Sequence, residues 1–527
     1  MRGDSVDSPA PPSLGTSDSL PMPPSLDRPL GLSEAERPPV SPAPQLSSGG
    51  FLSVRAFGAK GDGLSLDGPA IQAAIDRAAA FGGGTVLLPP GGYVSGSLFL
   101  RNDICLRLEP GAVLLGSRDP RDYPLVDSRW EGSTRKSHAA LLHAAGARNL
   151  SIVGGGTIDG RGEEWWRLFA AGSLAHPRPR LIALEDCERI LLEGFEARNS
   201  PSWTVNPVRS RDVRISGISI RNPADSPNTD GINPDSCRSV RISDCFVSVG
   251  DDCITIKAGT ESERPELRSP CRDIVVTNCV LERGHGGVVF GSETSGGISD
   301  VAISNCVFKG TDRGIRMKSR RGRGGTVERI RVSNITMRDV LCPFTMNLHY
   351  GCGAWGDPVV GDRGARTPGE STPHFRDISF NAISASGGRV AAAFLDGLAE
   401  APIERVSFSD VSISMEGGAE PQPAEMADGL EPLARAGFRA SNLSGLRLHN
   451  LRIEGQEGPA FRFENCEGVE GAFCSPRLEF EGHGFRAEDR GLRSEGRGGG
   501  AESPGSWPDG QGPSAEGRGH GSLGRER

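Results

Sequence analysis

The chain has 527 residues, of which 73 are glycine, and only 6 % of its residues are aromatic. This composition favours many short strands and tight turns over a helical core. A net charge of −8 argues against a nucleic-acid or anionic-membrane partner, although it leaves room for a local basic patch that holds an acidic substrate. No segment approaches the ~20 apolar residues of a membrane-spanning helix, and the twelve cysteines form no CxxC pair, so a zinc site is not expected.

Composition divides the chain into three parts. Residues 1–48 are rich in Pro and Ser and residues 484–527 are rich in Gly, Arg and Glu, so both segments are expected to be disordered. The folded domain is expected to run from 49 to 483. Its first helix is predicted over residues 70–80, with Asp67 as its cap and the glycines after Phe81 as its end.

From about residue 140 the chain repeats a strand pattern and shows no helix pattern. Each repeat has a short apolar alternation, a polar step and a second alternation, as in SVRISDCFVSVGDDCITIK. The equivalent positions Ile218, Cys245, Cys279, Cys306 and Ile335 are 27, 34, 27 and 29 residues apart. Such a period predicts an all-β solenoid, most simply a single-stranded right-handed parallel β-helix with the early helix as its cap. A leucine-rich repeat or a propeller fits the pattern less well.

Six cysteines recur at two repeat positions. Equivalent residues of successive coils stack ~4.8 Å apart, which predicts two ladders of small buried thiols, with an occasional disulfide left open. The first set is Cys245, Cys279 and Cys306, and the second is Cys187, Cys237 and Cys271.

Four consecutive second alternations can be aligned on their first apolar residue. They begin at Asp230 (DGINPDS), Asp251 (DDCITIK), His285 (HGGVVFGSE) and Asp312 (DRGIRMKSR). The alignment predicts an inward stack on the four coils. The members of that stack are Ile232, Ile254, Val288 and Ile315.

Polar residues of the same repeats converge outside this stack. Asp230 falls beside Asp252 one coil away, and His285 falls beside Asp251 on the next coil. The two cations of the RMK segment alternate with apolar residues and therefore face outward. The resulting strip holds three carboxylates, one histidine and two cations, namely Asp230, Asp251, Asp252, His285, Arg316 and Lys318.

Each feature has a plainer interpretation when it is taken alone. Two aspartates after a glycine usually form a solvated turn, His285 could be a loop residue, and the two cations could be a solvated strand face. Lys257, at the end of DDCITIK, is expected to be scaffold surface. The convergence of all these residues on one strip favours a functional site.

Four motifs occur in order along this strip, namely NTDG (228–231), GDDC (250–253), GHG (284–286) and RMK (316–318). Together they resemble the polygalacturonase family, glycoside hydrolase family 28, and the resemblance extends over roughly residues 50–470. The family's usual motif at 316–318 is Arg-Ile-Lys, and Met317 replaces its isoleucine with another apolar residue, which is a mild change. The resemblance implies a pectin-lyase-like β-helix that hydrolyses α-1,4-galacturonosidic bonds of pectin with inversion, without a metal or other cofactor.

The resemblance also implies roles for the acids. Asp251 would protonate the glycosidic oxygen, and Asp230 and Asp252 would activate the attacking water. His285 would keep the acid protonated and oriented. An inverting acid and base need a gap of ~6.5–9.5 Å for the water, which stacking across coils could supply.

Five further residues are expected to bind substrate. Arg316 and Lys318 would hold the uronate carboxylate beside the bond that is cut. Asn228 would orient a turn or a sugar hydroxyl. Trp203 and Tyr350 are candidate sugar-contacting aromatics, with a packing role as the alternative for each.

Two other functions stay open from the sequence. One is a calcium-dependent pectate lyase that cuts by elimination with an arginine base, and the other is a non-catalytic carbohydrate-binding β-helix. The Arg-x-Lys pair favours galacturonate over a neutral or rhamnose-containing step at the cut site. Exo action is favoured over endo action, because the insertions at 259–270 and 352–374 could close the groove.

The expected partner is an acidic polysaccharide or oligosaccharide, with neither nucleic acid nor membrane as a partner, and we expect a monomer. The family implies an extracellular or periplasmic enzyme. The first residues of the chain show no apolar core of a signal peptide, so localisation is left open.

Overall fold

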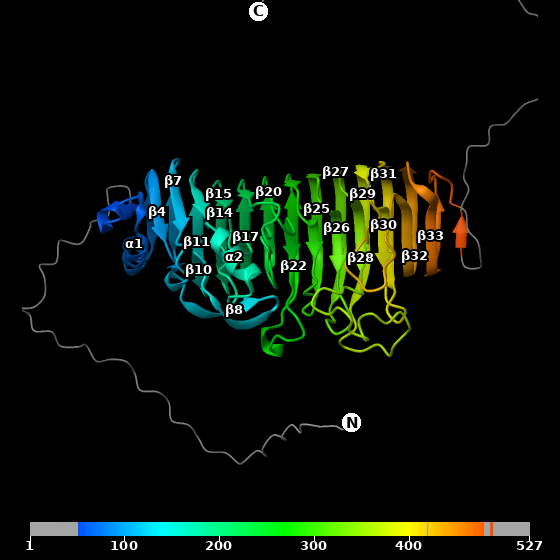
Figure 1. The fold of residues 1–527 in the computed structure, drawn as a ribbon, viewed down its shortest axis with the longest axis horizontal. Coiled ribbons are helices and arrows are strands. Elements are labelled where there is room, and N and C mark those ends of the chain that lie inside the picture. Colours follow the sequence, from blue (N-terminus) through cyan, green and yellow to red (C-terminus); the bar gives the residue numbers. More distant parts are fainter. Residues whose placement is uncertain (1–50, 419, 479–484, 488–527) are drawn as a thin grey trace, which may run out of the picture.

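The computed structural model describes residues 51–418, 420–478 and 485–487. In these ranges the chain winds into one elongated parallel β-helix, with successive coils side by side from the N-terminal to the C-terminal end (Figure 1). The fold predicted from the repeats is therefore confirmed. The predicted 1–48 segment and most of the predicted 484–527 segment lie outside the described residues. Strand β35 (Phe485–Ala487) pairs in parallel with β34 (Val469–Ala472) just beyond the expected end of the domain.

Successive coils form three parallel ladders of strands. The first ladder contains β1 (Phe51–Ser53), β3 (Gly84–Leu88), β6 (Ile104–Leu108), β11 (Arg148–Val153), β14 (Glu188–Glu193), β17 (Arg211–Ser216), β19 (Arg238–Ser243), β22 (Cys271–Thr277) and β34. The second contains β2 (Asp62–Leu66), β4 (Gly91–Ser95), β7 (Ala112–Gly116), β12 (Thr157–Asp159), β15 (Glu196–Arg198), β18 (Ser219–Arg221), β20 (Phe246–Ser248) and β23 (Val280–Glu282). Later strands bend from the first ladder into the second, namely β25 (Ile298–Lys309), β27 (Thr326–Arg338), β29 (His374–Gly388) and β31 (Ile403–Met415).

The third ladder carries the residues of the predicted site. It contains β5 (Leu98–Phe99), β10 (Leu142–Ala145), β13 (Ile182–Glu185), β16 (Val205–Val208), β21 (Ile254–Ile256), β24 (Gly286–Phe290), β26 (Arg313–Lys318), β28 (Cys342–Asn347), β30 (Ala391–Asp396), the start of β32 (Ala436–Glu454) and β33 (Glu457–Glu467). Isolated bridges at Ile232 and Asp235 join β16 to the coil of β21. The ladder is thus continuous along the solenoid.

Helices and one hairpin decorate this scaffold. Helix α1 (Gly68–Ala80) packs its apolar face against the first coils, as expected for a cap. The expected capping by Asp67 is wrong, because its carboxylate accepts hydrogen bonds from the backbone N of Lys60 (2.7 Å) and Gly61 (3.0 Å) instead. The remaining elements are α2 (Glu163–Ala170), the short 3-10 helices η2 (Val54–Phe57), η3 (Pro120–Asp122) and η4 (Pro265–Leu267), and the antiparallel hairpin of β8 (Leu125–Trp130) and β9 (Ser133–His138). Among the described helices none is long and apolar enough to cross a membrane.

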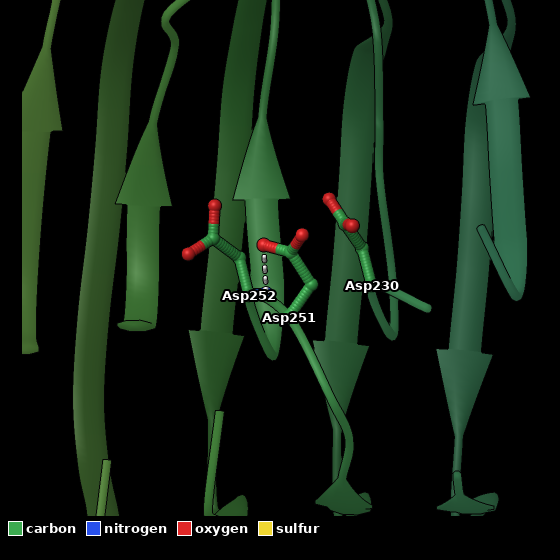
Figure 2. A group of neighbouring side chains, drawn as sticks. All are labelled: Asp230, Asp251 and Asp252. Atoms are coloured by element: carbon green, nitrogen blue, oxygen red, sulfur yellow. Dashed lines mark hydrogen bonds between the residues drawn. The ribbon is translucent and has the colours of Figure 1, made fainter. Parts of the chain in front are cut away.

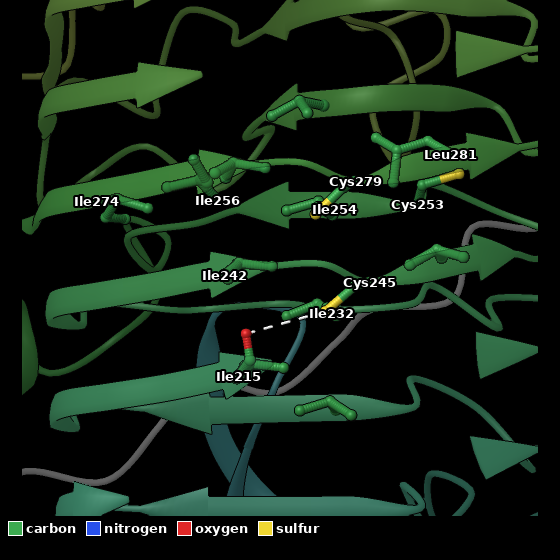
Figure 3. Packing of buried hydrophobic residues seen from close by; sticks show 14 of the residues in the cluster. Ile215, Ile232, Ile242, Cys245, Cys253, Ile254, Ile256, Ile274, Cys279 and Leu281 are labelled. Atoms are coloured by element: carbon green, nitrogen blue, oxygen red, sulfur yellow. Dashed lines mark hydrogen bonds between the residues drawn. The ribbon is translucent and has the colours of Figure 1, made fainter. Parts of the chain in front are cut away.

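The interior of the coils is a continuous apolar core. Ile232 pairs with Ile254, Ile254 with Val288 and Val288 with Ile315, which is the register expected from the sequence. All four side chains are buried, and Figure 3 shows the first two among their neighbours. The alignment that placed the polar strip is therefore correct along the backbone.

The cysteines form buried ladders, as expected. Cys245, Cys279 and Cys306 occupy neighbouring coils, and every cysteine of the chain carries a free thiol. In the second set Ser210 lies on the coil between Cys187 and Cys237, where its hydroxyl accepts a hydrogen bond from the backbone N of Cys187. These thiols fill the core and do not face the polar strip.

Candidate active site

Three aspartates meet on the outward face of the third ladder. The Ile232–Ile254 bridge sets Asp230 beside Asp252 on adjacent coils, and Asp251 precedes Asp252 in the chain (Figure 2). One carboxylate oxygen of each lies within 4.8 Å of the others. The strip predicted from the sequence therefore forms a compact carboxylate cluster.

The cluster is tighter than the gap expected between an inverting acid and base. Side chains on neighbouring coils stand only ~4.8 Å apart, and Asp251 turns toward both partners at the bend after Gly250. Gly250 is required there, because a Cβ at that position would lie 2.4 Å from the carbonyl oxygen of Ser226. The expected spacing of ~6.5–9.5 Å is thus not what the unliganded carboxylates show.

Asp252 is the carboxylate with two cationic partners. Lys318 Nζ lies 2.8 Å from its Oδ2, and Arg316 Nη1 lies 3.4 Å from its Oδ1. Burial by itself would raise the pKa of Asp252, but the two cations hold that pKa below its usual value. Asp252 therefore stays ionised.

Asp230 has the opposite tendency. Its side chain is buried and accepts a hydrogen bond from Asn233 Nδ2 at 3.2 Å. Burial first, and then the neighbouring charge of Asp251, raise the pKa of Asp230 well above its usual value, although Lys257 opposes the shift. The protonated form is therefore favoured at Asp230 and the ionised form at Asp252.

Asp251 is the member of the cluster that solvent reaches, with 21 % of its side chain exposed. Its Oδ1 accepts a hydrogen bond from the backbone N of Asp252 at 2.9 Å and lies 3.3 Å from Nδ1 of His285. The hydrogen bond to Asp251 raises the pKa of His285 above its usual value. The expected neighbourhood of His285 and Asp251 is present, but His285 lies outside the cleft described below.

Arg316 faces away from the core, as expected, but it is covered. Glu425 grips its guanidinium from outside with contacts of 2.8 Å to Nε and 2.9 Å to Nη2, and Thr345 Oγ1 donates to the same carboxylate. Burial would raise the pKa of Glu425, but Arg316 and Arg313 lower it to about 2. Arg316 is thus engaged by two carboxylates, while Lys318 lines the cleft.

Two aromatic residues flank the cluster. Trp203 stacks on Trp130 of the β8–β9 hairpin, with ring centroids 5.0 Å apart, and Lys257 Nζ lies 4.9 Å from the centroid of Trp203. On the other side Tyr350 lies 5.2 Å from Lys318 Nζ. Both aromatics are largely buried but line the cleft, so they combine packing with a surface for a ligand.

A cleft of about 410 Å³ opens over the three carboxylates. Of the nine residues proposed from the sequence, seven line it, namely Trp203, Asn228, Asp230, Asp251, Asp252, Lys318 and Tyr350. Asn228 also accepts a hydrogen bond from Arg178 Nη2 at 2.6 Å. His285 and Arg316 contact the carboxylates without lining the cleft.

Several lining residues were missed from the sequence. Lys257 is not scaffold surface: it is buried, pairs with Glu293 at 3.0 Å, and lines the cleft. The alternation of DDCITIK gave a signal for it, since Lys257 shares its outward phase with Thr255. The β8–β9 hairpin and loops supply the others, which no periodic pattern in the sequence indicates, including Glu131, Ser133, Arg135, Thr260, Glu261, Ser262, Arg320 and Arg323.

The β8–β9 hairpin and the 259–270 insertion form one wall of the cleft. Arg129 in the hairpin is fully buried and contacts Asp235 at 2.8 Å and Glu263 at 3.2 Å. Thr134 Oγ1 donates to Glu263 at 2.8 Å. These contacts fix the hairpin to the insertion across more than a hundred residues of sequence.

The carboxylate cluster could also hold a cation by its oxygen atoms. Both oxygens of Asp252 already face cations of the protein, Lys318 and Arg316, which offset its charge. The donor set therefore fits a divalent ion poorly unless these ion pairs open.

The sequence matches the family described as "Glycosyl hydrolases family 28" over residues 128–428, and residues 51–107 match "Rhamnogalacturonase A/epimerase, pectate lyase-like". A "Probable polygalacturonase" of Vitis vinifera is 34 % identical over 388 residues, which cover 71 % of this chain and 77 % of that protein. The exopolygalacturonase of Thermotoga maritima superposes with a TM-score of 0.65 at 26 % identity, covering 78 % of this chain and 93 % of the other. The family 28 exopolygalacturonase of Yersinia enterocolitica shares the fold, with a TM-score of 0.66 at 24 % identity and coverage of 80 % and 78 %.

Proposed function

The chain belongs to glycosyl hydrolases family 28, and on that premise we propose that it hydrolyses α-1,4-galacturonosidic bonds of galacturonan or its oligomers. The observation that carries the proposal is the carboxylate cluster at the floor of the cleft, with Lys318 beside it. An acidic polymer needs cations at the cut site, and hydrolysis needs one protonated and one ionised carboxyl group.

We assign the general acid to Asp251, which reaches solvent in the cleft. Its proton passes to the glycosidic oxygen as the bond to the leaving sugar breaks, and water attacks the anomeric carbon. Asp252, held ionised by Lys318 and Arg316, takes part in removing the proton of that water. Asp230, in its ionised form, joins Asp252 as a base.

The cleft offers separate groups for the sugar and its carboxylate. Lys318 binds the uronate at the cut site, and Arg316 acts behind it by fixing Asp252. Asn228 binds a hydroxyl group, and the edges of Trp203 and Tyr350 contact the sugar ring. His285 orients Asp251 through their contact of 3.3 Å.

Exo action is supported by the wall that Arg129 fixes. The β8–β9 hairpin and the 259–270 insertion both line the cleft, so a long chain meets them as it extends past the carboxylates. If this wall blocks one end of the cleft, the cleft accepts only the terminus of a polymer and releases small products.

Product analysis on polygalacturonate tests the proposal. Galacturonate monomer alone is expected, and a ladder of oligomers would overturn exo action while keeping hydrolysis. Proton NMR of the first product is expected to show inversion, and a retained anomer would contradict the assigned bases. Absorbance of an unsaturated uronide that a chelator abolishes would instead indicate a calcium-dependent lyase. Binding of polygalacturonate without turnover would indicate a non-catalytic β-helix. Faster cleavage of rhamnogalacturonan than of polygalacturonate would contradict galacturonan as the substrate.

A further inference from the structure

A second cleft, which we call the distal cleft, lies over β30, β32 and β33 on the third ladder. Its volume is about 500 Å³, and it shares no lining residue with the catalytic cleft. Its lining residues include Phe394, Arg439, Arg462, Glu431 and Glu464. The distal cleft is therefore a separate site on the same face of the solenoid.

The strand register places the distal cleft relative to the catalytic centre. Arg316 pairs with Thr345, Thr345 with Phe394, and Phe394 with Arg439. Arg439 thus occupies the same outward row as Arg316, three coils or about 14 Å further along the solenoid. Between them the 352–374 segment is held down by Arg363, whose Nη1 lies 2.5 Å from Asp396.

Arg439 has two guanidinium nitrogen atoms without a hydrogen-bond partner in the described part of the chain. These atoms are Nε and Nη1, and both are buried. Arg462, its neighbour on the next coil, has a carboxylate partner in Glu464 at 2.7 Å. Burial, and then the like charge of Arg462, lower the pKa of Arg439, although the charge of Glu464 opposes the shift.

A partly buried guanidinium with unpaired donors is stabilised by a bound anion. Buried donors of a charged group are normally satisfied, and leaving them unpaired costs more than a typical hydrogen bond contributes. Two like charges on adjacent strands add to that cost. The distal cleft is the space from which a ligand can approach and offset the charge of Arg439.

We propose that the distal cleft binds a uronate unit of an acidic saccharide, with its carboxylate paired to Arg439. Phe394 offers an apolar ring to the sugar, and the carboxylates of Glu431 and Glu464 face the cleft as acceptors for hydroxyl groups. The identity of the saccharide rests on the proposed function, whereas the need for an anion rests on Arg439. A second site on the same chain raises the effective concentration of a polymer at the catalytic cleft without adding a catalytic group.

Calorimetric titration with trigalacturonate tests the distal cleft directly. In Asp251→Asn, which prevents consumption of the ligand, two molecules per chain are expected to bind. Adding Arg439→Met is expected to leave one, while Arg447→Met is expected to leave two. Arg447 is the matched control, since it is an exposed arginine of the same strand, paired with Glu470 and outside the cleft. The fully methyl-esterified trimer, which lacks the carboxylate charge, is expected to lose distal binding.

Each outcome of the titration tests a different part of the two proposals. One bound trimer in all three proteins would overturn the distal site and keep the proposed function. Distal binding of the neutral ester would overturn pairing with Arg439, and no binding at all would overturn both proposals. In the otherwise unchanged enzyme, Arg439→Met is expected to raise KM for polygalacturonate about tenfold, the value of one charge-assisted hydrogen bond, with unaltered turnover of trigalacturonate. Equal KM values in Arg439→Met and Arg447→Met would contradict the proposal.

Discussion

Central strands of the third ladder, such as β21 and β28, bury both of their faces, but they do so in opposite ways. On the inner face apolar side chains stack on apolar side chains, as Ile254 does between Ile232 and Val288. On the outer face side chains of opposite charge contact each other, as Asp252 contacts Lys318 and Arg316. The same alternation of residues therefore builds an apolar stack and a charged cluster on opposite sides of one strand.

The two faces differ in what they tolerate. The inner stack needs apolar side chains of suitable volume, and exchanges that conserve volume cost little. The outer cluster needs every charge to keep its partner, because a buried charge left alone is strongly destabilising. We therefore expect inner substitutions to change stability and outer substitutions to change chemistry.

The largest expected effect is on the outer face, from Asp251→Asn. An amide cannot donate the proton to the leaving oxygen, so kcat on polygalacturonate is expected to fall by a factor of about 10²–10⁴. The melting temperature is expected to change little, because Asp251 is partly exposed. Reducing-end assays and circular dichroism measure both quantities.

The matched control for this variant is Asp212→Asn. Asp212 lies on the first ladder and pairs with Arg241 at the surface, and its positive φ suits asparagine. Full activity is expected there. Full activity in Asp251→Asn as well would remove Asp251 from the role of acid.

Glu425→Ala tests whether the outer face also contributes stability. The substitution leaves Arg316 buried without the partner that contacts it at 2.8 and 2.9 Å, which is expected to cost about 3–5 kcal/mol of unfolding free energy. Urea unfolding measures the loss. Glu454→Ala, which removes an exposed glutamate, is expected to stay within about 0.5 kcal/mol of the parent. Equal midpoints for the two variants would show that the Glu425–Arg316 pair contributes nothing net.

Glu425 also shows where inference from sequence stops. The coils follow a period, so the fold, the inward stack and the pairing of Asp230 with Asp252 could all be obtained by aligning repeats. Glu425 lies more than a hundred residues from Arg316, in a segment that covers the ladder from outside and obeys no period. Its contact follows from tertiary packing alone.

The same limit explains the other differences at the site. Lys257 is outward by alternation, but only the folded chain brings Glu293 and Trp203 to it and buries it. The hairpin that carries Arg129 is antiparallel inside a parallel solenoid, so repeat analysis passes over it. Asp67 faces a glycine-rich loop whose backbone N–H groups compete for its carboxylate, and the pattern of a helix cap does not reveal that competition.

Ile254→Ala probes the inner face. Removal of the buried side chain leaves a cavity between neighbouring coils and is expected to cost about 2–5 kcal/mol of unfolding free energy, measured in urea. The control is Val275→Ala, an exposed apolar residue of β22, for which a change within about 0.5 kcal/mol is expected. Activity per folded molecule is expected to stay near the parent value in Ile254→Ala. A fall in kcat comparable to that of Asp251→Asn would mean that the two faces are not separable.

The smallest effect is expected from removal of Lys257, a cation that shifts the pKa of Asp230 without forming an ion pair with Asp252. The charge of Lys257 favours the ionised form of Asp230, against burial, so its loss raises the pKa of Asp230 further. The double variant Lys257→Met with Glu293→Gln removes the charge without leaving a buried carboxylate unpaired. Because Asp230 must lose its proton to act as a base, the acidic limb of the pH profile of kcat/KM is expected to move to higher pH, with an unchanged plateau. Lys257→Arg keeps the charge and is expected to keep the limb, and an unmoved limb in the double variant would show that Lys257 does not govern the proton on Asp230.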